Sequence, residues 1–292
     1  MKKIVFLCVF FLFLSTFIFA YYIFYSEFTP GDKIELRYPV VLVHGIARNE
    51  RRRYMQPWGR ISRVLRENGI EVYYGNTDAW GNIVSNAELL KNTIDSILET
   101  TGHKRVNIIA HSKGGIDARY LIWKYYYGDK VASLTTISTP HNGSEIADFF
   151  FNSEIIYTRP VRRQIQTFGR IFGDVNPDIF SVNHNLTTEN MREFNSMVVK
   201  DRKVFYQSIY SIMYSPSDDP VFSLSHAHIK KLSGENDGLV SANSANWGYM
   251  VMRLPYSLSH EQIIDRGGRR VHGMKVPNIY LEIVHQLSRN GF

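Results

Sequence analysis

The chain has 292 residues, of which 44% are hydrophobic and 21% are charged, and its formal net charge is +7. This composition is ordinary for a globular protein with a sizeable core, in one large domain or two small ones. A single cysteine, Cys8, excludes an intrachain disulfide and a cysteine-based zinc site. The positive charge could attract nucleic acid or anionic lipid, but no nucleic-acid motif accompanies it, so we expect no nucleic-acid partner.

The first 25 residues are interpreted as a transmembrane or signal segment. Lys2 and Lys3 precede an apolar run from Ile4 to Tyr25, which is long enough to cross a bilayer. Ile18 stands where a signal cleavage site needs a small residue, and this favours an uncleaved anchor over a cleaved signal. We expect Lys2 and Lys3 to stay in the cytoplasm, so that the remaining chain lies outside it. That part is then anchored to the membrane, or secreted if the segment is cleaved.

A short linker, residues 26–37, leads into a single predicted domain, residues 38–292. Strands are predicted at residues 38–43, 71–75, 106–110, 131–138 and 204–210, the first of which is a continuous apolar run. Helical periodicity marks residues 83–101, 114–127 and the tail from residue 276. Strands that alternate with helices predict an α/β fold, in which a mostly parallel sheet is covered by helices on both faces.

Residues 145–200 break this alternation. They carry no clear strand signal, but many aromatic residues and arginines. We interpret the segment as a helical cap or lid over one end of the sheet, and an ordinary run of packing helices is the alternative. Four of its arginines could face anionic head groups, although a solvated helix face fits them equally well: Arg159, Arg162, Arg163 and Arg170.

The stretch "NIIAHSKGG", residues 107–115, ends a predicted strand at Ser112. Strand, tight turn and helix form the nucleophile elbow, usually written G-x-S-x-G, in which small residues flank the serine so that strand and helix can approach. Here Ala110 and Gly114 hold those positions, and Gly115 adds room. Alanine breaks the literal motif but meets its steric requirement. A serine that only caps a helix is the alternative, and we favour Ser112 as a nucleophile.

A serine nucleophile needs a histidine base that follows it in chains of this architecture. The candidates are His260, His272 and His285. Ser259 and Gln262 match a capping box, S-x-x-Q, which would place His260 in the first turn of a helix at the end of a loop. His285 falls within the terminal amphipathic helix, and His272 lies in a loop of uncertain role. We therefore favour His260 as the base.

The acid of such a triad lies between the serine and the histidine in the sequence. The stretch "GENDGLVS" contains Asp237 in a turn, with Glu235 as a local rival. Asn-Asp-Gly is also a plain turn signal. Position and order favour Asp237 as the acid.

An oxyanion hole needs backbone N–H groups that point at the developing negative charge. One is expected from Lys113, which follows the nucleophile at a helix N-terminus. The other is expected from Ile46, in the loop after the first buried strand, where His44 and Gly45 turn the chain. The side chain of Lys113 need not take part in the chemistry.

At these residues the sequence resembles the bacterial triacylglycerol lipases and esterases of the α/β-hydrolase superfamily. The matching segments are "VHGI" (43–46), "AHSKGG" (110–115), "STPHNGS" (138–144) and "NDGLV" (236–240). The resemblance runs from about Tyr38 to the C-terminus and implies an α/β-hydrolase fold with a helical lid after "STPHNGS". It implies a structural role for His141. It also implies the triad Ser112, Asp237 and His260, with oxyanion N–H groups from Ile46 and Lys113.

The resemblance raises one point about cofactors. Many lipases of this type carry a structural calcium ion, with an aspartate two residues after the catalytic histidine. Here that position is Gln262. Asp265, Asp218 and Asp219 could supply ligands, and a glutamine oxygen can bind calcium, but the carboxylate charge is missing. A structural calcium ion is therefore possible, but we predict no metal site and no cofactor.

The resemblance implies a serine hydrolase that cleaves carboxylic esters of lipids through an acyl-enzyme. An acyltransferase or a thioesterase could use the same triad, because these enzymes differ in the acceptor or leaving group that the pocket admits. A non-catalytic hydrolase-fold binding module is less favoured, since such a protein is expected to lose a triad residue. The expected partners are a lipid or ester substrate and, through the N-terminal segment, a membrane. We expect a monomer.

Overall fold

The computed structural model describes residues 34–47, 57–151, 170, 174–175, 177–268 and 270–292. The predicted N-terminal membrane segment and most of the predicted linker lie outside these residues. In the part of the chain that the structure describes, no helix combines the length and the apolar character that a bilayer crossing requires.

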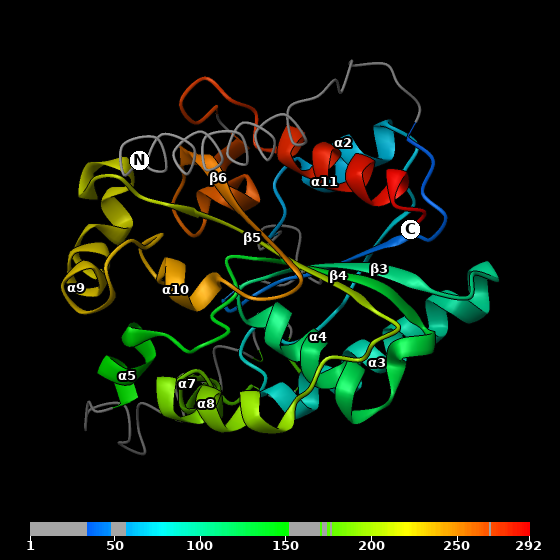
Figure 1. Ribbon diagram of the computed structural model, residues 1–292, viewed down its shortest axis with the longest axis horizontal. Helices are drawn as coiled ribbons and strands as arrows, with labels where there is room; N and C mark the ends of the chain where they lie inside the picture. Colours follow the sequence, from blue (N-terminus) through cyan, green and yellow to red (C-terminus); the bar gives the residue numbers. More distant parts are fainter. Residues whose placement is uncertain (1–33, 48–56, 152–169, 171–173, 176, 269) are drawn as a thin grey trace, which may run out of the picture.

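A parallel sheet forms the centre of the molecule (Figure 1). Within the described residues it has six strands, in the order β2-β1-β3-β4-β5-β6, and every neighbouring pair is parallel. The strands are β1 (Val40–Val43), β2 (Val72–Tyr74), β3 (Val106–His111), β4 (Val131–Ile137), β5 (Phe205–Ile212) and β6 (Met250–Ser257). Every residue of β1, β3 and β4 is buried, as expected for strands covered on both faces.

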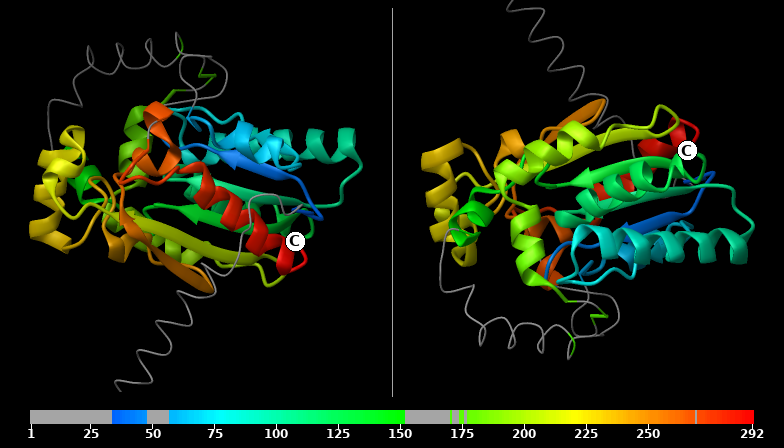
Figure 2. Two further views of the ribbon diagram at one scale, coloured as in Figure 1. Left: turned by 90° about the horizontal axis from the view of Figure 1, so that it is seen from above. Right: turned by 90° about the horizontal axis from the view of Figure 1, so that it is seen from below.

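Helices pack on both faces of this sheet, which confirms the predicted α/β architecture. The described helices are α2 (Ile61–Glu67), α3 (Ile83–Thr101), α4 (Lys113–Lys124), α5 (Glu145–Phe151), α7 (Ile179–Asn185), α8 (Thr188–Met197), α9 (Ser223–Ser233), α10 (Ala242–Ala245) and α11 (Pro277–Arg289). Short 3₁₀ turns are η2 (Tyr127–Asp129), η4 (Pro216–Asp218), η5 (Pro220–Phe222), η6 (Gln262–Ile264) and η7 (Arg266–Gly268). Figures 1 and 2 show α2 and α11 on one face and α3 and α4 on the other.

Two apolar clusters fill the space between the sheet and its helices. One joins β1 to α2 and α11, where the rings of Trp58 and Tyr280 meet edge to face with 6.2 Å between their centroids. The other joins β1, β3 and β4 to α3 and α4. The predicted boundaries of α3 agree with its caps: the Asn82 side chain accepts the N–H of Ser85, and Gly102 ends the helix at a φ of 73°.

Four of the helices and strands were not predicted: α2, α9, α10 and β6. The apolar and polar run at residues 228–232, which precedes the predicted acid, belongs to α9. In β6, exposed and buried residues alternate, and the strand carries Arg253 and Pro255. Such a sequence lacks the continuous apolar signal of a central strand, and Pro is tolerated because β6 is at the edge of the sheet.

The predicted cap segment, residues 145–200, is helical where the structure describes it. Helices α5, α7 and α8 come from it, and Figure 1 shows α5 beside α9 at one end of the molecule. Met191 and Phe194 of α8 share an apolar cluster with Ile116 of α4. The segment therefore packs on the domain through buried side chains. Of the four arginines considered for head-group contact, Arg159, Arg162 and Arg163 lie outside the described residues, and a lid function remains a prediction.

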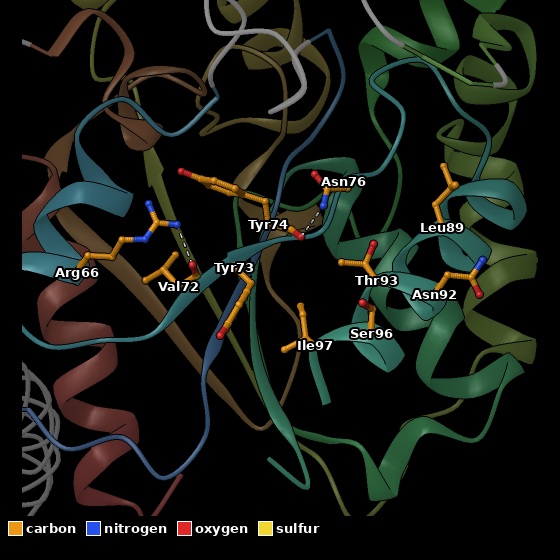
Figure 3. A pocket seen from close by; sticks show the side chains of 10 residues that line it. All are labelled: Arg66, Val72, Tyr73, Tyr74, Asn76, Leu89, Asn92, Thr93, Ser96 and Ile97. Atoms are coloured by element: carbon orange, nitrogen blue, oxygen red, sulfur yellow. Dashed lines mark hydrogen bonds between the residues drawn. The ribbon is translucent and has the colours of Figure 1, made fainter. Parts of the chain in front are cut away.

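Strand β2 lies at the other edge of the sheet, beside a groove of about 590 Å³ (Figure 3). Two side chains cap its outward carbonyl groups. Arg66 Nη2 donates to the carbonyl oxygen of Val72 at 2.7 Å, and Asn76 Nδ2 donates to that of Tyr74 at 3.4 Å. Residues of β2 and α3 line the groove, and none of the predicted triad residues is among them.

Candidate active site

The turn between β3 and α4 carries Ser112 in a strained conformation. Its φ of 54° and ψ of −131° lie in a region that residues other than glycine rarely adopt. Glycines permit the close approach of the surrounding chain. A Cβ atom on Gly114 would stand 2.4 Å from the carbonyl oxygen of His44, and one on Gly45 would stand 2.7 Å from the Cβ atom of Ser112. The chain therefore turns sharply here and presents the serine at the end of β3.

The structure brings Ser112, His260 and Asp237 together. Ser112 Oγ lies 2.9 Å from His260 Nε2, and His260 Nδ1 lies 2.8 Å from Asp237 Oδ2. All three side chains are buried. Because a carboxylate only accepts hydrogen bonds, Nδ1 carries the proton of a neutral imidazole and Nε2 accepts from the serine hydroxyl. This is the orientation in which the histidine can remove the serine proton.

The turn after Asp237 fixes the carboxylate. Asp237 Oδ1 accepts the backbone N–H groups of Leu239 and Val240, at 3.0 and 2.8 Å, which leaves Oδ2 for the histidine. The backbone N–H of His260 also donates to the carbonyl oxygen of Asp237 at 2.9 Å. Main-chain and side-chain hydrogen bonds thus join the same two residues.

Burial and charge act in opposite directions on His260. Burial disfavours the imidazolium and lowers the pKa, but the attraction and hydrogen bond of Asp237 raise it by more, so that the pKa of His260 is above its usual value. The site therefore favours the charged histidine that proton transfer from Ser112 creates.

The two predicted oxyanion donors lie in segments that converge on Ser112. Lys113 opens α4, and the first N–H groups of a helix have no acceptor within it. Ile46 lies in the loop after β1. In this loop the N–H of Ala47 donates to the carbonyl oxygen of Ala79 at 3.3 Å, and His44 Nε2 lies 3.1 Å from the carbonyl oxygen of Thr77.

The side chain of Lys113 points into the core. Its Nζ lies 2.7 Å from Asp117 Oδ1, and both side chains are 1% exposed. Asp117 also accepts from Asn86 at 2.9 Å. The lysine of the "AHSKGG" segment is therefore engaged in a buried ion pair.

The remaining predicted support residues are placed around the turn. Ala110 is buried in β3, and a Cβ atom on Gly115 would stand 2.3 Å from Thr139 Oγ1. His141 is stacked on Trp247, with ring centroids 4.5 Å apart, and bonds to Arg119. This arrangement is consistent with a structural part for His141.

The rival candidates lie elsewhere. His272 is exposed in a turn, His285 belongs to α11, and Glu235 pairs with Arg253 on the surface at 2.7 Å. The capping box of Ser259 and Gln262 forms both of its hydrogen bonds. The element that follows is a single 3₁₀ turn, η6, so the prediction of a regular helix at His260 was wrong.

The sequence reasoning missed His111. Its Nε2 lies 2.9 Å from the carbonyl oxygen of His260, and the two rings tilt against each other with centroids 4.7 Å apart. Only its position beside Ser112 could have indicated this contact, because 149 residues separate it from His260. His111 therefore packs directly on the candidate base.

The residues considered for a metal have protein partners. Asp265 pairs with Arg60, with 2.7 Å between Oδ1 and Nη2, and also accepts the backbone N–H of Arg60 at 2.7 Å. Across the described ranges, no three histidine, cysteine or acidic side chains are grouped as metal ligands would be.

Comparisons with known proteins show which family the chain belongs to. The family model for palmitoyl protein thioesterase matches residues 39–202. "Triacylglycerol lipase 2" of Saccharomyces cerevisiae is 30% identical over 255 residues, which cover 80% of this chain and 74% of the yeast protein. A triacylglycerol lipase of Pseudarthrobacter phenanthrenivorans is 32% identical over 173 residues, or 54% of this chain and 53% of that protein, so that the chain matches about half of this relative.

A solved structure shares the fold. The mature form of the Bacillus licheniformis lipase BlEst2 has a TM-score of 0.64 at 20% identity, and the match covers 87% of this chain and 93% of that one. At this identity the likeness concerns the fold alone.

Proposed function

Because the chain belongs to the palmitoyl protein thioesterase family of α/β hydrolases, with triacylglycerol lipases as relatives, it is a carboxylic ester hydrolase, and we propose that it cleaves carboxylic esters of lipids with Ser112, His260 and Asp237. The observation that carries the proposal is the buried line of hydrogen bonds from Ser112 Oγ to His260 and on to Asp237.

The proposed reaction is acyl transfer to water. His260 takes the proton of Ser112 while its Oγ attacks the ester carbonyl, and the N–H groups of Ile46 and Lys113 stabilise the oxyanion. His260 then protonates the leaving alcohol, and an acyl-enzyme remains. His260 next removes a proton from water, which attacks the acyl-enzyme, and returns that proton to Ser112 Oγ as the fatty acid leaves. Asp237 orients His260 throughout and stabilises its charged form.

Exposed aromatic side chains on the proposed lid support an apolar substrate. Phe149 and Phe150 of α5 are exposed, at 59% and 45%, on the segment proposed as a lid. We propose that residues 145–200 cover the acyl chain, that residues 1–25 anchor the enzyme to a membrane, and that the catalytic domain works outside the cytoplasm as a monomer.

A thioesterase is the second candidate, and the family model favours it directly, since its description is that of a palmitoyl protein thioesterase. The same triad attacks a thioester carbonyl and releases a thiol in place of an alcohol. Comparing palmitoyl thioesters with oxygen esters of the same acyl chain would decide between the two. An acyltransferase would instead reveal itself by faster turnover when an alcohol acceptor is added.

Hydrolysis of p-nitrophenyl esters, from acetate to palmitate, by the full-length chain in detergent tests the proposal. We expect Ser112→Ala and His260→Ala to lower kcat by about 10⁴-fold or more. His272→Ala is the matched control and should retain wild-type activity. If the wild type cleaves no ester and Ser112 resists a fluorophosphonate probe, the hydrolase proposal falls and a binding module replaces it.

A further inference from the structure

We infer that Asp219 is a positioning residue for His260, and that the turn at Asp218 and Asp219 holds the histidine loop by hydrogen bonds alone, without a cation. The inference rests on the proposed function, because positioning matters only if His260 acts as the base. Asp219 lies on the loop after β5, 40 positions before Ser259 in the sequence.

The first contact involves Ser259, the residue immediately before His260. Ser259 Oγ donates to Asp219 Oδ2 at 2.6 Å, and both side chains are buried. Asp219 Oδ1 accepts the backbone N–H of Val221 at 3.1 Å, so the carboxylate is itself fixed at the start of η5. A buried hydrogen bond to a charged group is stronger than one between neutral groups. Asp219 thus holds one side of the histidine.

The second contact involves Gln262, two residues after His260. Its Oε1 accepts the backbone N–H of Ser259 at 2.9 Å, and its Nε2 donates to the carbonyl oxygen of Asp218 at 3.0 Å. A backbone N–H can only donate and a carbonyl oxygen can only accept, so the two neighbours fix which end of the amide is which. Gln262 thus ties the other side of the histidine to the same turn.

The turn that receives these contacts is itself hydrogen-bonded. The Asp218 carboxylate accepts the N–H groups of Tyr214 and Ser215, at 2.8 and 2.9 Å, and the hydroxyl of Ser257. Burial raises the pKa of Asp218, but the hydrogen bonds from Ser257 and the backbone lower it by more, so that its pKa is below the usual value. Hydrogen bonds therefore connect this turn to the loop around His260 at Ser257, Ser259 and Gln262.

This arrangement does not fit the calcium ion that the lipase resemblance raised. A calcium site needs carboxylate, carbonyl or amide oxygens that converge on the ion. Here Gln262 presents its amide nitrogen to Asp218, both oxygens of Asp219 accept hydrogen bonds, and Asp265 pairs with Arg60. A cation at this place would meet the N–H₂ group of Gln262 and would compete with the donors that already bond to these carboxylates. The hydrogen bonds themselves supply the restraint.

Kinetics of the full-length chain in detergent test the inference. The variants are Asp219→Ala, its isostere Asp219→Asn, and Ser217→Ala, a control in the same turn whose hydroxyl bonds to Ser215. We expect Asp219→Ala to lower kcat on p-nitrophenyl butyrate by about 10- to 100-fold with little change in KM, because small displacements of a catalytic group are costly. Asp219→Asn should restore most of kcat, since its amide oxygen can accept from Ser259. Ser217→Ala should match the wild type.

The pH profile separates positioning from a loss of folded enzyme. If His260 moves away from Asp237, the acid limb of kcat/KM shifts to lower pH in Asp219→Ala, whereas a smaller folded fraction leaves the profile unchanged. Wild-type activity and Tm should be the same in EDTA and in calcium. The inference would be overturned if the wild type lost activity in EDTA and regained it with calcium, and if calcium failed to restore activity to Gln262→Ala.

Amide hydrogen exchange keeps the inference testable without turnover. Residues 257–264 should exchange faster in Asp219→Ala and in Ser259→Ala than in Ser217→Ala. Unchanged exchange together with unchanged kcat overturns the inference and leaves the hydrolase proposal intact. Faster exchange in an enzyme that cleaves no ester supports the restraint and removes the proposed function.

Discussion

Lys113 follows the candidate nucleophile Ser112, and its Nζ atom lies 2.7 Å from Asp117 Oδ1; both side chains are 1% exposed. Asn86 donates to the same carboxylate and bonds to both the backbone N–H and the carbonyl group of Asp78. The ion pair thus connects the start of α4 to the loop after β2.

Removal of one partner of this pair should be costly. Asp117→Leu would leave a buried ammonium group without its counter-charge, and we expect a loss of about 3–5 kcal/mol in the free energy of unfolding. The double variant Lys113→Met with Asp117→Leu should recover most of that loss, because it buries no charge. Urea denaturation measures both. A loss in Asp117→Leu no larger than that in Glu67→Ala, which breaks an exposed pair with Arg63, would contradict this prediction.

The pH dependence of activity should follow His260. Its pKa is raised, and only the neutral imidazole can act as a base, so kcat/KM should fall with decreasing pH at a pH above the ordinary histidine value of 6.5. Asp237→Asn should move this limb to lower pH and reduce kcat by about 10³- to 10⁴-fold. A pH profile of wild type and variant checks both. An identical acid limb in the two proteins would exclude Asp237 as the partner of the base.

The stability contribution of the same pair should have the opposite pH dependence. A histidine whose pKa is raised on folding stabilises the folded chain below its unfolded pKa, and this contribution disappears as pH rises through the folded pKa. Denaturation of wild type and Asp237→Asn should therefore differ more at acidic than at alkaline pH. An equal difference at every pH would contradict the assignment.

Replacement of two glycines near Ser112 by alanine should have different effects, one on activity and the other on stability. In Gly45→Ala the new methyl group meets Ser112 Cβ at 2.7 Å and Oγ at 3.2 Å, so we expect a folded protein with kcat reduced by about 100-fold. In Gly114→Ala it meets the backbone of His44 at 2.4 Å, and we expect unfolding to become easier by about 3 kcal/mol. Gly69→Ala has open space around it but a φ of 81°, so it controls for activity alone: its kcat should be normal, although the backbone conformation makes it less stable. Full activity in Gly45→Ala would contradict the close packing.

Acid stability should depend on Asp95. Burial raises the pKa of this carboxylate, but hydrogen bonds from Lys130, Lys91 and Tyr127 outweigh it and lower the pKa to about 2. A depressed pKa stabilises the folded state above the unfolded value of 3.8, and the contribution is lost as pH falls towards 2. Asp95→Asn should cost about 1 kcal/mol at neutral pH, after allowance for solvent screening, and almost nothing near pH 2. A cost that does not change with pH would contradict this account.

The central strands could be predicted because burial on both faces leaves a local signal. Strand β1 is a continuous apolar run, and β3 and β4 are rich in β-branched and apolar residues, whereas β6 alternates and contains Pro255. The edge strand β6 and partly exposed helices such as α9 mix polar and apolar residues, so their sequences resemble loops.

The candidate triad could be predicted from the order of its residues in the chain and from the turn residues beside each of them. The residues that surround the triad could not be predicted. Asp219 meets Ser259 across 40 residues, and His111 meets the backbone of His260 across 149 residues. Neither aspartate nor histidine has a flanking pattern that indicates such a contact, because the contact depends on how β3 and β5 are arranged in the sheet.

The capped carbonyl groups of β2 bear on how this protein behaves when many copies gather at one place, as on a lipid surface. An open strand edge invites a strand from another molecule, and repeated pairing of this kind leads to aggregates. Arg66 and Asn76 already occupy the outward acceptors of Val72 and Tyr74, and the strand has only three residues. A second chain would find too few partners here to extend the sheet, so crowding at an interface should not turn this edge into a seed for β-aggregation.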